Sequence, residues 1–392
     1  MPALVTPQTE RVLLRPHESE RCGGPMCRSC ADEICGEPVC PMCVQLFERS
    51  NLHEGRLAHD SARSAMSREY LRELELARYE HASARAAERA LGRPPASERL
   101  WLIDADQLVH AAFHGVPLDD PTPTPQLGIY VNAVVGFARS IRRITRAHNA
   151  ELVIAVFDGE NGGGWRKKLC PAYKSDRDGD ADALVHQWPL VYQICNAMDL
   201  PMAKLEGVEA DDLIASYTEA AVRAGMSVEI CSNDSDMLAL VRGDGRRGSV
   251  RVFGTRNKAP FIDAAGVLEK LGVPPELVED WRALVGGKDG LSGVHGIGGK
   301  IGAELLMMHG SLEKLIDKAP ILPKGKRNDA IIRSRHDLQL WRQIVALDRE
   351  QELPFELDEL APWRPDTRGL DTFARDVLGY PGGWRDIRVS AR

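Results

Sequence analysis

Short apolar runs, each followed by an acidic residue, alternate with stretches of helical periodicity along most of the chain. The clearest runs and their followers are Leu100–Ile103 before Asp104, Leu152–Phe157 before Asp158, and Ser227–Cys231 before an Asn-Asp-Ser-Asp run. Apolar runs of this length, bounded by polar residues, are typical of buried strands. Their alternation with helices predicts a parallel sheet covered by helices, which is the α/β fold class.

Composition and periodicity divide the chain into four segments. We expect a Cys-rich segment over residues 1–55, a long helix with a linker over 56–97, an α/β domain over 98–262, and a helical region over 263–392. Residues 56–91 contain neither Pro nor Gly, which favours one continuous helix, and Pro94 and Pro95 would stop it. From about Pro274 onward the pattern is wholly helical, with glycine-rich turns.

Hydropathy and net charge narrow the class of protein. No apolar stretch of the sequence is long enough to cross a bilayer, and residues 1–20 lack the apolar core of a signal peptide. We therefore expect a cytoplasmic protein that makes no membrane contact. The formal net charge of −7 argues against a uniformly basic nucleic-acid binder. It does not exclude a protein whose acidic residues are neutralised by bound metal ions.

Acidic residues gather where the predicted strands end and where helices begin. The set comprises Asp104, Asp158, Glu209, Asp211, Asp212, Asp234, Asp236 and Asp289. Because the carboxyl ends of parallel strands share one edge of a sheet, we expect these side chains to converge. An oxygen-rich pocket of this kind suits Mg²⁺ or Mn²⁺, and repulsion among the carboxylates favours bound cations.

Each acidic residue also has a simpler interpretation. Glu209, Asp212 and Asp236 stand in the first turns of predicted helices, where capping or the helix dipole alone favours an acid. Asp104, directly after a strand, could be an ordinary turn residue. The joint pattern is harder to explain in this way. Acids at successive strand ends, with Glu-Ala-Asp-Asp and Asp-Ser-Asp spacing, favour a metal site.

Several motifs follow one another in a characteristic order: IDADQL, VFDG, AYKSDR, GVEADDLIAS, NDSDMLAL and GVHGIGGKIGAELL. The series resembles the 5′ nuclease superfamily, which includes the N-terminal nuclease domain of bacterial DNA polymerase I, phage 5′-exonucleases and flap endonucleases. The resemblance covers roughly residues 99–350 and does not extend before residue 99. It implies a PIN-like parallel sheet flanked by helices, with the catalytic domain at 98–262 and a helix-hairpin-helix subdomain in the helical region.

The resemblance implies hydrolysis of DNA by a two-metal mechanism. By motif, the first metal would be surrounded by Asp104, Asp158, Glu209 and Asp211 with Asp212 close by, and the second would be served by Asp234, Asp236 and Asp289. One ion would generate hydroxide from its bound water, and both would stabilise charge on the attacking and leaving oxygens. No side-chain nucleophile is then required.

Two positions depart from the family pattern. The family usually has a second Asp three residues before the one matched by Asp289, where this chain has Gly286. The Arg that commonly follows the first Asp by seven residues is Ala111 here, which removes a cation that would steer phosphate. We expect the first change to weaken the second metal site, and either change could reduce activity or alter metal dependence.

A basic segment, WRKKLCPAYKSDR, follows Asp158 at residues 165–177. A run of positively charged residues, considered without its neighbours, is most often a solvated loop. The neighbouring acids and the Tyr-Lys-x-x-Arg order, which is similar to the helical arch of these nucleases, favour a DNA contact instead. The resemblance implies that Lys174 and Arg177 act as catalytic residues on the scissile or adjacent phosphates. It also implies that Arg166 contacts DNA and that Tyr173 stacks on a base.

The glycine-rich segment GVHGIGGK at 293–300 is a second candidate for DNA contact. Repeated glycines between two helices let backbone N–H groups approach a phosphate, and the next helix directs its positive N-terminus at it. An ordinary helix–helix turn is the alternative. The pattern favours binding of duplex DNA, independent of base sequence, through Gly293, Gly296, Gly298 and Lys300. The related nucleases often hold K⁺ at this hairpin, which makes K⁺ a candidate ligand here.

Six of the nine cysteines lie between positions 22 and 43. Cys27 and Cys30 form one CxxC pair, and Cys40 and Cys43 form another. Four thiolates from two such turns suit a tetrahedral structural Zn²⁺, with unliganded thiols as the alternative. The family resemblance does not extend to this segment and gives no purpose for it.

The sequence favours a metal-dependent 5′→3′ exonuclease and 5′-flap endonuclease that acts on DNA 5′ ends or flaps in replication or repair. We expect a monomer, with a separate DNA polymerase as a candidate partner. The first alternative is a structure-selective DNA-end-binding protein with weakened or lost catalysis, motivated by Gly286 and Ala111. The second is a PIN-like ribonuclease, which shares the acids but gives no reason for the helix-hairpin-helix.

Overall fold

The computed structural model describes residues 99–116, 127–175, 179–243, 248–254, 261–321 and 325–387. The expected Cys-rich segment and the long helix fall at residues 1–97, outside the described residues. Among the helices that are described, none combines the length and the apolar character that crossing a bilayer requires.

A six-stranded sheet with the order β3-β2-β1-β4-β5-β6 forms the centre of the fold. Its strands are β1 (Arg99–Asp104), β2 (Leu152–Val156), β3 (Met202–Ala203), β4 (Ser227–Cys231), β5 (Val250–Phe253) and β6 (Phe261–Ile262). All neighbouring pairs are parallel except β5 and β6, which are antiparallel. The predicted α/β class is confirmed, and the three expected strands are β1, β2 and β4 at the middle of the sheet.

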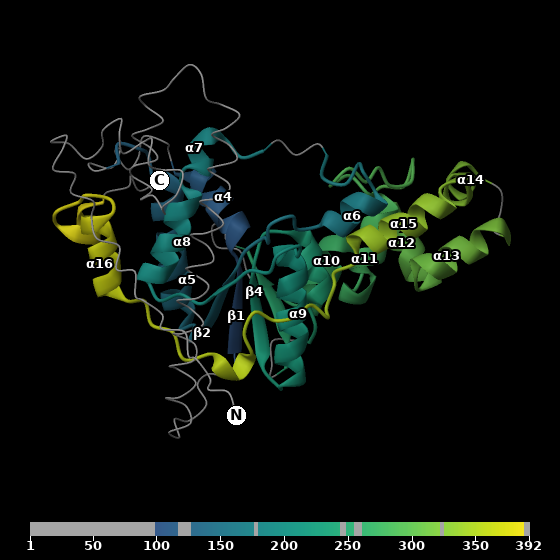
Figure 1. The fold of residues 1–392 in the computed structure, drawn as a ribbon. Helices are drawn as coiled ribbons and strands as arrows, with labels where there is room; N and C mark the ends of the chain where they lie inside the picture. Colours follow the sequence, from purple (N-terminus) through teal and green to yellow (C-terminus); the bar gives the residue numbers. More distant parts are fainter. Residues whose placement is uncertain are drawn as a thin grey trace, which may run out of the picture. The chain divides into compact units, whose positions relative to one another are not determined.

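Helices cover both faces of this sheet. Successive side chains of a strand point to opposite faces, so apolar residues of one strand pack against helices on both sides. Trp101 and Ile103 of β1 pack with the helices on one face, and Leu100 and Leu102 pack with those on the other. The first face is covered by α4 (Ala105–Gly115), α5 (Asn132–His148), α8 (Trp188–Ala197) and α16 (Thr367–Asp376). The second face is covered by α9 (Ala210–Arg223), with α10 (Ala264–Leu271) and the helices that follow it alongside (Figure 1).

The C-terminal part is helical, as expected from the sequence. It contains α11 (Val278–Val285), α12 (Gly299–His309), α13 (Leu312–Lys318), α14 (Lys326–Arg333) and α15 (Arg335–Val345). Shorter elements are α6 (Gly164–Leu169), α7 (Asp182–Val185) and the 3₁₀ turns η2 (Ser235–Leu240), η3 (Pro275–Leu277), η4 (Ala319–Ile321), η5 (Leu357–Glu359) and η6 (Gly383–Asp386).

The predicted helix-hairpin-helix corresponds to α11 and α12, and small residues let these helices approach closely. A side chain at Gly302 would meet Val285, since a Cβ there would lie 2.7 Å from the Val285 Cγ2. The Trp281 indole N–H donates to the Gly299 carbonyl at 2.9 Å and fixes the start of α12.

Three of the acidic residues lie at the end of a strand or at the start of a helix. Asp104 ends β1 and caps α4 by accepting a hydrogen bond from the Gln107 backbone N–H at 3.1 Å. Asp234 follows β4 and caps η2 by accepting from the Asp236 backbone N–H at 3.0 Å. Asp211 lies in the first turn of α9. The fold therefore brings these acids to the carboxyl edge of the sheet, where parallel α/β proteins bind ligands.

Candidate active site

Asp104, Asp158, Asp211 and Asp234 lie within electrostatic reach of one another. Burial raises the pKa of Asp104 to about 6, with smaller contributions from the charges of Asp234 and Asp158. Burial also raises the pKa of Asp211 well above its usual range, and the charges of Asp234, Asp104 and Asp158 raise it further. The four carboxylates come from segments far apart in the sequence, and their charges act on one another at the carboxyl edge of the sheet. That they share one metal ion stays a prediction.

A hydrogen-bond network orients Asp104 towards this cluster. The Ser232 hydroxyl donates to Asp104 Oδ2 at 2.7 Å, and the Gln107 amide Nε2 donates to Ser232 Oγ at 3.3 Å. The Gln107 carbonyl oxygen accepts from the Asn233 backbone N–H at 2.6 Å. The segment after β4 is thereby tied to the end of β1, which fixes the spacing between Asp104 and Asp234.

Asp106 belongs to the same cluster, although the sequence analysis did not select it. Its Oδ2 accepts a hydrogen bond from the Asp158 backbone N–H at 2.8 Å. Burial raises the pKa of Asp106 well above its usual range, and the charges of Asp158 and Asp104 add to the shift. The Asp-Ala-Asp spacing, which repeats the Asp-x-Asp spacing at 234–236, was the sequence feature that could have revealed it.

The chemistry of this first set suits a divalent cation. Asp104, Asp106, Asp158 and Asp211 offer only oxygen ligands, and none of them forms an ion pair with a described lysine or arginine. Asp158 is exposed, so the cluster is open to solvent on one side. In the described part of the chain, no three His, Cys, Asp or Glu side chains are close enough to hold an ion as they stand. The side chains must therefore close in further to coordinate one, and their metal roles stay predictions.

The second predicted set, Asp234, Asp236 and Asp289, does not fit a divalent ion in the same way. The Lys288 ammonium donates to both carboxylate oxygens of Asp234, at 2.7 and 2.5 Å. Asp236 lies 2.6 Å from Arg282, measured from Oδ1 to Nε. These carboxylates already have cationic partners from the protein itself, so the predicted second metal site is not supported by the structure.

Glu209 and Asp212 are bound by a buried arginine. Arg166 donates from Nη1 to Glu209 Oε2 at 2.5 Å and to Asp212 Oδ2 at 2.6 Å, and from Nη2 to Asp212 Oδ1 at 2.7 Å. The Asp348 backbone N–H also donates to Asp212 Oδ1, at 2.9 Å. Both oxygens of Asp212 are thus occupied, and the prediction that it lies beside the first metal is corrected: it anchors Arg166.

The prediction that Arg166 contacts DNA is also wrong. Its side chain is only 3% exposed, and it donates further hydrogen bonds to the carbonyl oxygens of Ile344 and Ala346, both at 2.8 Å. Glu209 keeps a low pKa, because Lys174 and Arg166 outweigh the burial that would otherwise raise it. The role of Arg166 is to join α6 to α9 and to the end of α15.

Tyr173 and Lys174 also face the interior. Tyr173 is 7% exposed, and its hydroxyl donates to Glu209 Oε1 at 3.2 Å, so stacking on a base, as predicted, is wrong. The Lys174 ammonium lies 2.5 Å from Glu209 Oε1 and is 16% exposed, and its contact with phosphate stays a prediction. Arg177 lies outside the described residues. The exposed cations of this segment are Lys167 and Lys168, on α6.

The glycine-rich hairpin divides into a packed part and an exposed part. Gly293 is buried with a φ of +65°, and a Cβ there would lie 2.1 Å from the Val285 carbonyl oxygen. Packing alone therefore requires this glycine, and its predicted DNA contact is corrected. Gly296, Gly298 and Lys300 are exposed at the start of α12, where the predicted phosphate contact remains open.

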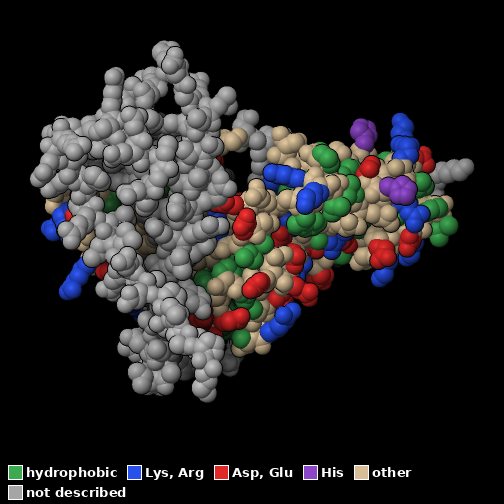
Figure 2. All heavy atoms as spheres, in the orientation of Figure 1, with side chains coloured by type: hydrophobic (Ala, Val, Ile, Leu, Met, Phe, Trp, Pro, Cys, Tyr) green, Lys and Arg blue, Asp and Glu red, His purple; other side chains and the backbone are tan. Residues whose placement is uncertain are grey.

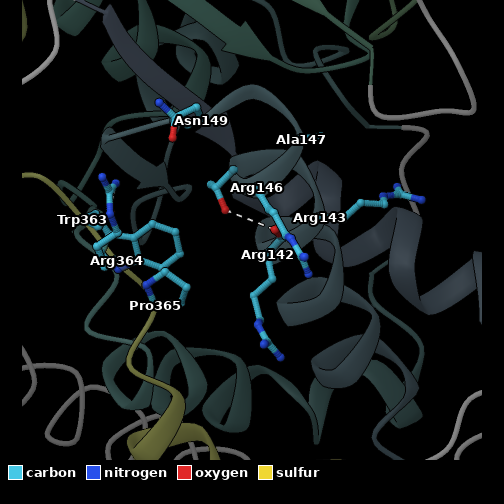
Figure 3. Close-up of a pocket in the computed structure, with 10 residues that line it drawn as sticks. Arg142, Arg143, Arg146, Ala147, Asn149, Trp363, Arg364 and Pro365 are labelled. Atoms are coloured by element: carbon cyan, nitrogen blue, oxygen red, sulfur yellow. Dashed lines mark hydrogen bonds between the residues drawn. The ribbon is translucent and has the colours of Figure 1, made fainter.

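A pocket of about 810 Å³ lies away from the acidic cluster, between the C-terminal end of α5 and residues 363–365 (Figure 3). Arg142, Arg143 and Arg146 line one side, and Arg364 lines the other. The end of α5 precedes β2, so this pocket lies at the amino edge of the sheet, opposite the acids. Arg364 is partly neutralised by Glu151 at 2.9 Å. The pocket takes no part in the acidic site.

Charges of both signs are exposed over the described helices on the face shown in Figure 2. This mixture agrees with the moderate net charge of −7. Positive potential is therefore local, and any attraction of an anionic substrate depends on individual lysines and arginines near the acidic cluster.

Comparison with known proteins assigns the chain to a family. Residues 99–272 match the 5′-3′ exonuclease N-terminal resolvase-like domain, and residues 273–368 match the 5′-3′ exonuclease C-terminal SAM fold. A 5′-3′ exonuclease of Aquifex aeolicus is 29% identical over 276 residues, covering 69% of this chain and 89% of that protein. DNA polymerase I of Rhizobium leguminosarum is 32% identical over 270 residues, covering 67% of this chain but only 26% of the polymerase.

Solved structures support the same fold. A T5 5′-exonuclease with bound zinc ions has a TM-score of 0.52 at 21% sequence identity, and the match covers 71% of this chain and 95% of that one. A bacteriophage T5 flap endonuclease variant in complex with DNA and metal ions gives the same values. The two family models together span the sheet, the acidic cluster and the hairpin. The chain therefore belongs to the 5′-3′ exonuclease family, whose members are nucleases that hydrolyse DNA.

Proposed function

We propose that this chain is a divalent-metal-dependent 5′→3′ exonuclease and 5′-flap endonuclease that hydrolyses phosphodiester bonds of DNA. The observation that carries the proposal is the convergence of Asp104, Asp158 and Asp211 at the carboxyl edge of the sheet. So many carboxylates raise one another's pKa and are unfavourable together unless a cation is bound.

Asp104, Asp158 and Asp211 would hold the divalent ion, with Asp106 as a supporting residue, and we propose Mg²⁺ or Mn²⁺ because all ligands are oxygens. When bound, such an ion supplies a hydroxide at neutral pH and stabilises negative charge on the phosphate. The protein's part is to orient the ligands: Ser232 and Gln107 hold Asp104, and Asp106 holds the backbone at Asp158. The bound metal ions of the T5 structures support metal dependence.

DNA would be held at two places near this cluster. Lys167 and Lys168 are exposed on α6, close in sequence to Lys174, which we retain as a candidate for phosphate contact. The exposed start of α12, with Gly296, Gly298 and Lys300, offers backbone N–H groups and a cation to a duplex backbone. A K⁺ ion bound at this hairpin is part of the same proposal.

The test is release of short products from a 5′-flap DNA substrate labelled at its 5′ end. We expect release with Mg²⁺ or Mn²⁺ and none with EDTA, and near-complete loss in Asp158→Ala and Asp211→Ala, each checked for retained folding. The matched RNA substrate should be cut far more slowly. Absence of release with either metal would reject the proposal, and preferential cleavage of RNA would favour a ribonuclease.

One observation favours a second candidate, a DNA-end-binding protein with weak catalysis. Lys288 and Arg282 are paired with Asp234 and Asp236, where the family pattern implies a second metal. A binding assay beside the cleavage assay separates the two candidates. Tight binding to the flap with no turnover at any metal concentration would support the second.

The remaining proposals concern cellular location, oligomeric state, a partner protein and a structural zinc ion. We propose a cytoplasmic monomer that acts in replication or repair, with a DNA polymerase as a candidate partner. We also propose a structural Zn²⁺ bound by Cys27, Cys30, Cys40 and Cys43. Metal analysis of the purified full chain tests the zinc proposal: we expect one zinc per chain, lost when Cys27 and Cys40 are both replaced by Ser.

A further inference from the structure

Carboxylates and protein cations form ion pairs at the place where the family pattern implies a second metal ion. Lys288 Nζ lies 2.7 and 2.5 Å from the two oxygens of Asp234 and 3.4 Å from Asp236 Oδ2. Its distance to Asp289 Oδ2 is 3.9 Å. Arg282 approaches Asp236 from the other side, at 2.6 Å. Three carboxylates therefore share two cations that belong to the protein.

Partial burial strengthens these interactions. Asp234 and Asp236 are each 17% exposed, and Lys288 is 31% exposed. The Lys288 ammonium occupies the oxygens that a second divalent ion would need.

The backbone turn that presents Lys288 is closed by two glycines. Gly286 has a φ of +65° and Gly293 has a φ of +65°, and these residues pack backbone against backbone. Gly287 N–H donates to the Leu291 carbonyl at 2.7 Å, and Leu291 N–H donates to the Lys288 carbonyl at 3.0 Å. These contacts fix the backbone on both sides of Lys288, and the hydrogen bonds to Asp234 and Asp236 hold its side chain.

The same turn excludes the carboxylate that the family pattern has at position 286. A Cβ on Gly286 would lie 2.2 Å from the Gly293 backbone nitrogen, and its positive φ disfavours any side chain. An aspartate could stand there only if the turn were rebuilt. The turn that presents Lys288 is thus the one that leaves no room for a side chain at position 286.

We propose that Lys288 is a built-in cation that replaces a second divalent ion between Asp234 and Asp236, so that the acidic pocket takes one divalent ion. This inference rests on the proposed function, because it assigns a role within the same site. Lys288 supplies one positive charge beside the cluster of Asp104, Asp158 and Asp211 at every metal concentration. It is a positioning residue, since it acts by holding Asp234 and Asp236.

The test counts Mn²⁺ ions bound to the full chain in the absence of DNA. Mn²⁺ prefers oxygen ligands, which limits competition from the cysteines. Bound ions are counted by isothermal titration calorimetry, with free Mn²⁺ followed by electron paramagnetic resonance. The wild type is compared with Lys288→Met, which keeps an apolar stem but removes the charge, and with Lys288→Arg, which keeps the charge. Lys270→Met, at an exposed position on α10, is the matched control.

We expect one ion in this pocket for the wild type, Lys288→Arg and Lys270→Met, and one additional ion for Lys288→Met. A wild type that already binds two ions overturns the inference, as does a folded Lys288→Met variant that binds no additional ion. Unfolding curves of each variant establish that the counts refer to folded protein. Because the titration contains no DNA, its result is independent of cleavage. An additional ion in Lys288→Met, together with a wild type that cuts no flap, would uphold this inference and reject the proposed function.

Discussion

The guanidinium group of Arg166 donates to both carboxylate oxygens of Asp212, at 2.6 and 2.7 Å, within the protein interior. The two side chains are 3% and 2% exposed. Because Arg166 also bonds to Glu209 and to the carbonyls of Ile344 and Ala346 at the end of α15, the pair connects α6, α9 and the end of α15. The pair is a buried link between elements of the fold.

Removal of this arginine should destabilise the protein. Arg166→Ala leaves the buried carboxylate of Asp212 without its cation and leaves Glu209 with Lys174 alone, and we expect the free energy of unfolding to fall by about 3–5 kcal/mol. Urea denaturation measures the change. Lys167→Ala, on the exposed side of the same helix, is the control and should cost under about 0.5 kcal/mol. Equal losses in the two variants would show that Arg166 is not a structural anchor.

Tyr173 should contribute to stability and not to DNA binding. Tyr173→Phe removes the hydroxyl that donates to Glu209, which should lower the free energy of unfolding by about 1 kcal/mol. The Kd for flap DNA should not change, because the ring is buried. Fluorescence anisotropy with a labelled flap measures the Kd. A clearly weaker affinity in a folded Tyr173→Phe variant would restore the interpretation as a DNA-contacting residue.

Asp106 should matter for metal binding, since it accepts the Asp158 backbone N–H. We expect Asp106→Ala to reduce metal affinity or cleavage by about 10- to 100-fold, as is typical when a residue that supports metal ligands is lost. Asp106→Asn keeps an acceptor oxygen and should lose less. Flap-cleavage rates across a Mg²⁺ titration give both quantities, with Asp337→Ala on the exposed face of α15 as the control. Full activity in Asp106→Ala contradicts the assignment.

Lys300 should contribute to DNA binding through charge alone. For Lys300→Ala we expect weaker binding to every duplex sequence, and a slope of log K against log salt that is shallower by about 0.9. Affinities at several salt concentrations give the slope. Lys314→Ala, on α13, controls for a general loss of positive charge. An unchanged slope for Lys300→Ala would remove the exposed start of α12 from the DNA interface.

The sequence predicted the parts of the fold that have strong local patterns. β1, β2 and β4 have five or six mostly apolar residues each, and the acids that end or follow them mark the carboxyl edge of the sheet. β3 and β6 have two residues each, too few for any periodicity to be recognised. Their places are determined by pairing with neighbouring strands, which is a tertiary effect.

The errors at the site share one physical cause. Arg166 and Tyr173 belong to a basic segment that local composition could not divide into buried and exposed faces. Their burial depends on Glu209, whose position is set by a distant helix. The sequence also did not indicate the role of Lys288. The direction of its side chain depends on the positive φ values of the turn around it.

The most direct test of the central claim measures ion binding and cleavage on the same variants. Asp104→Asn and Asp211→Asn keep the shape of each side chain and remove one negative charge from the pocket. We predict that both variants lose Mn²⁺ affinity and flap cleavage together, while their unfolding curves stay close to that of the wild type. Flap cleavage at the wild-type rate in either variant, or cleavage that persists in EDTA, would contradict the claim that these carboxylates hold the catalytic ion.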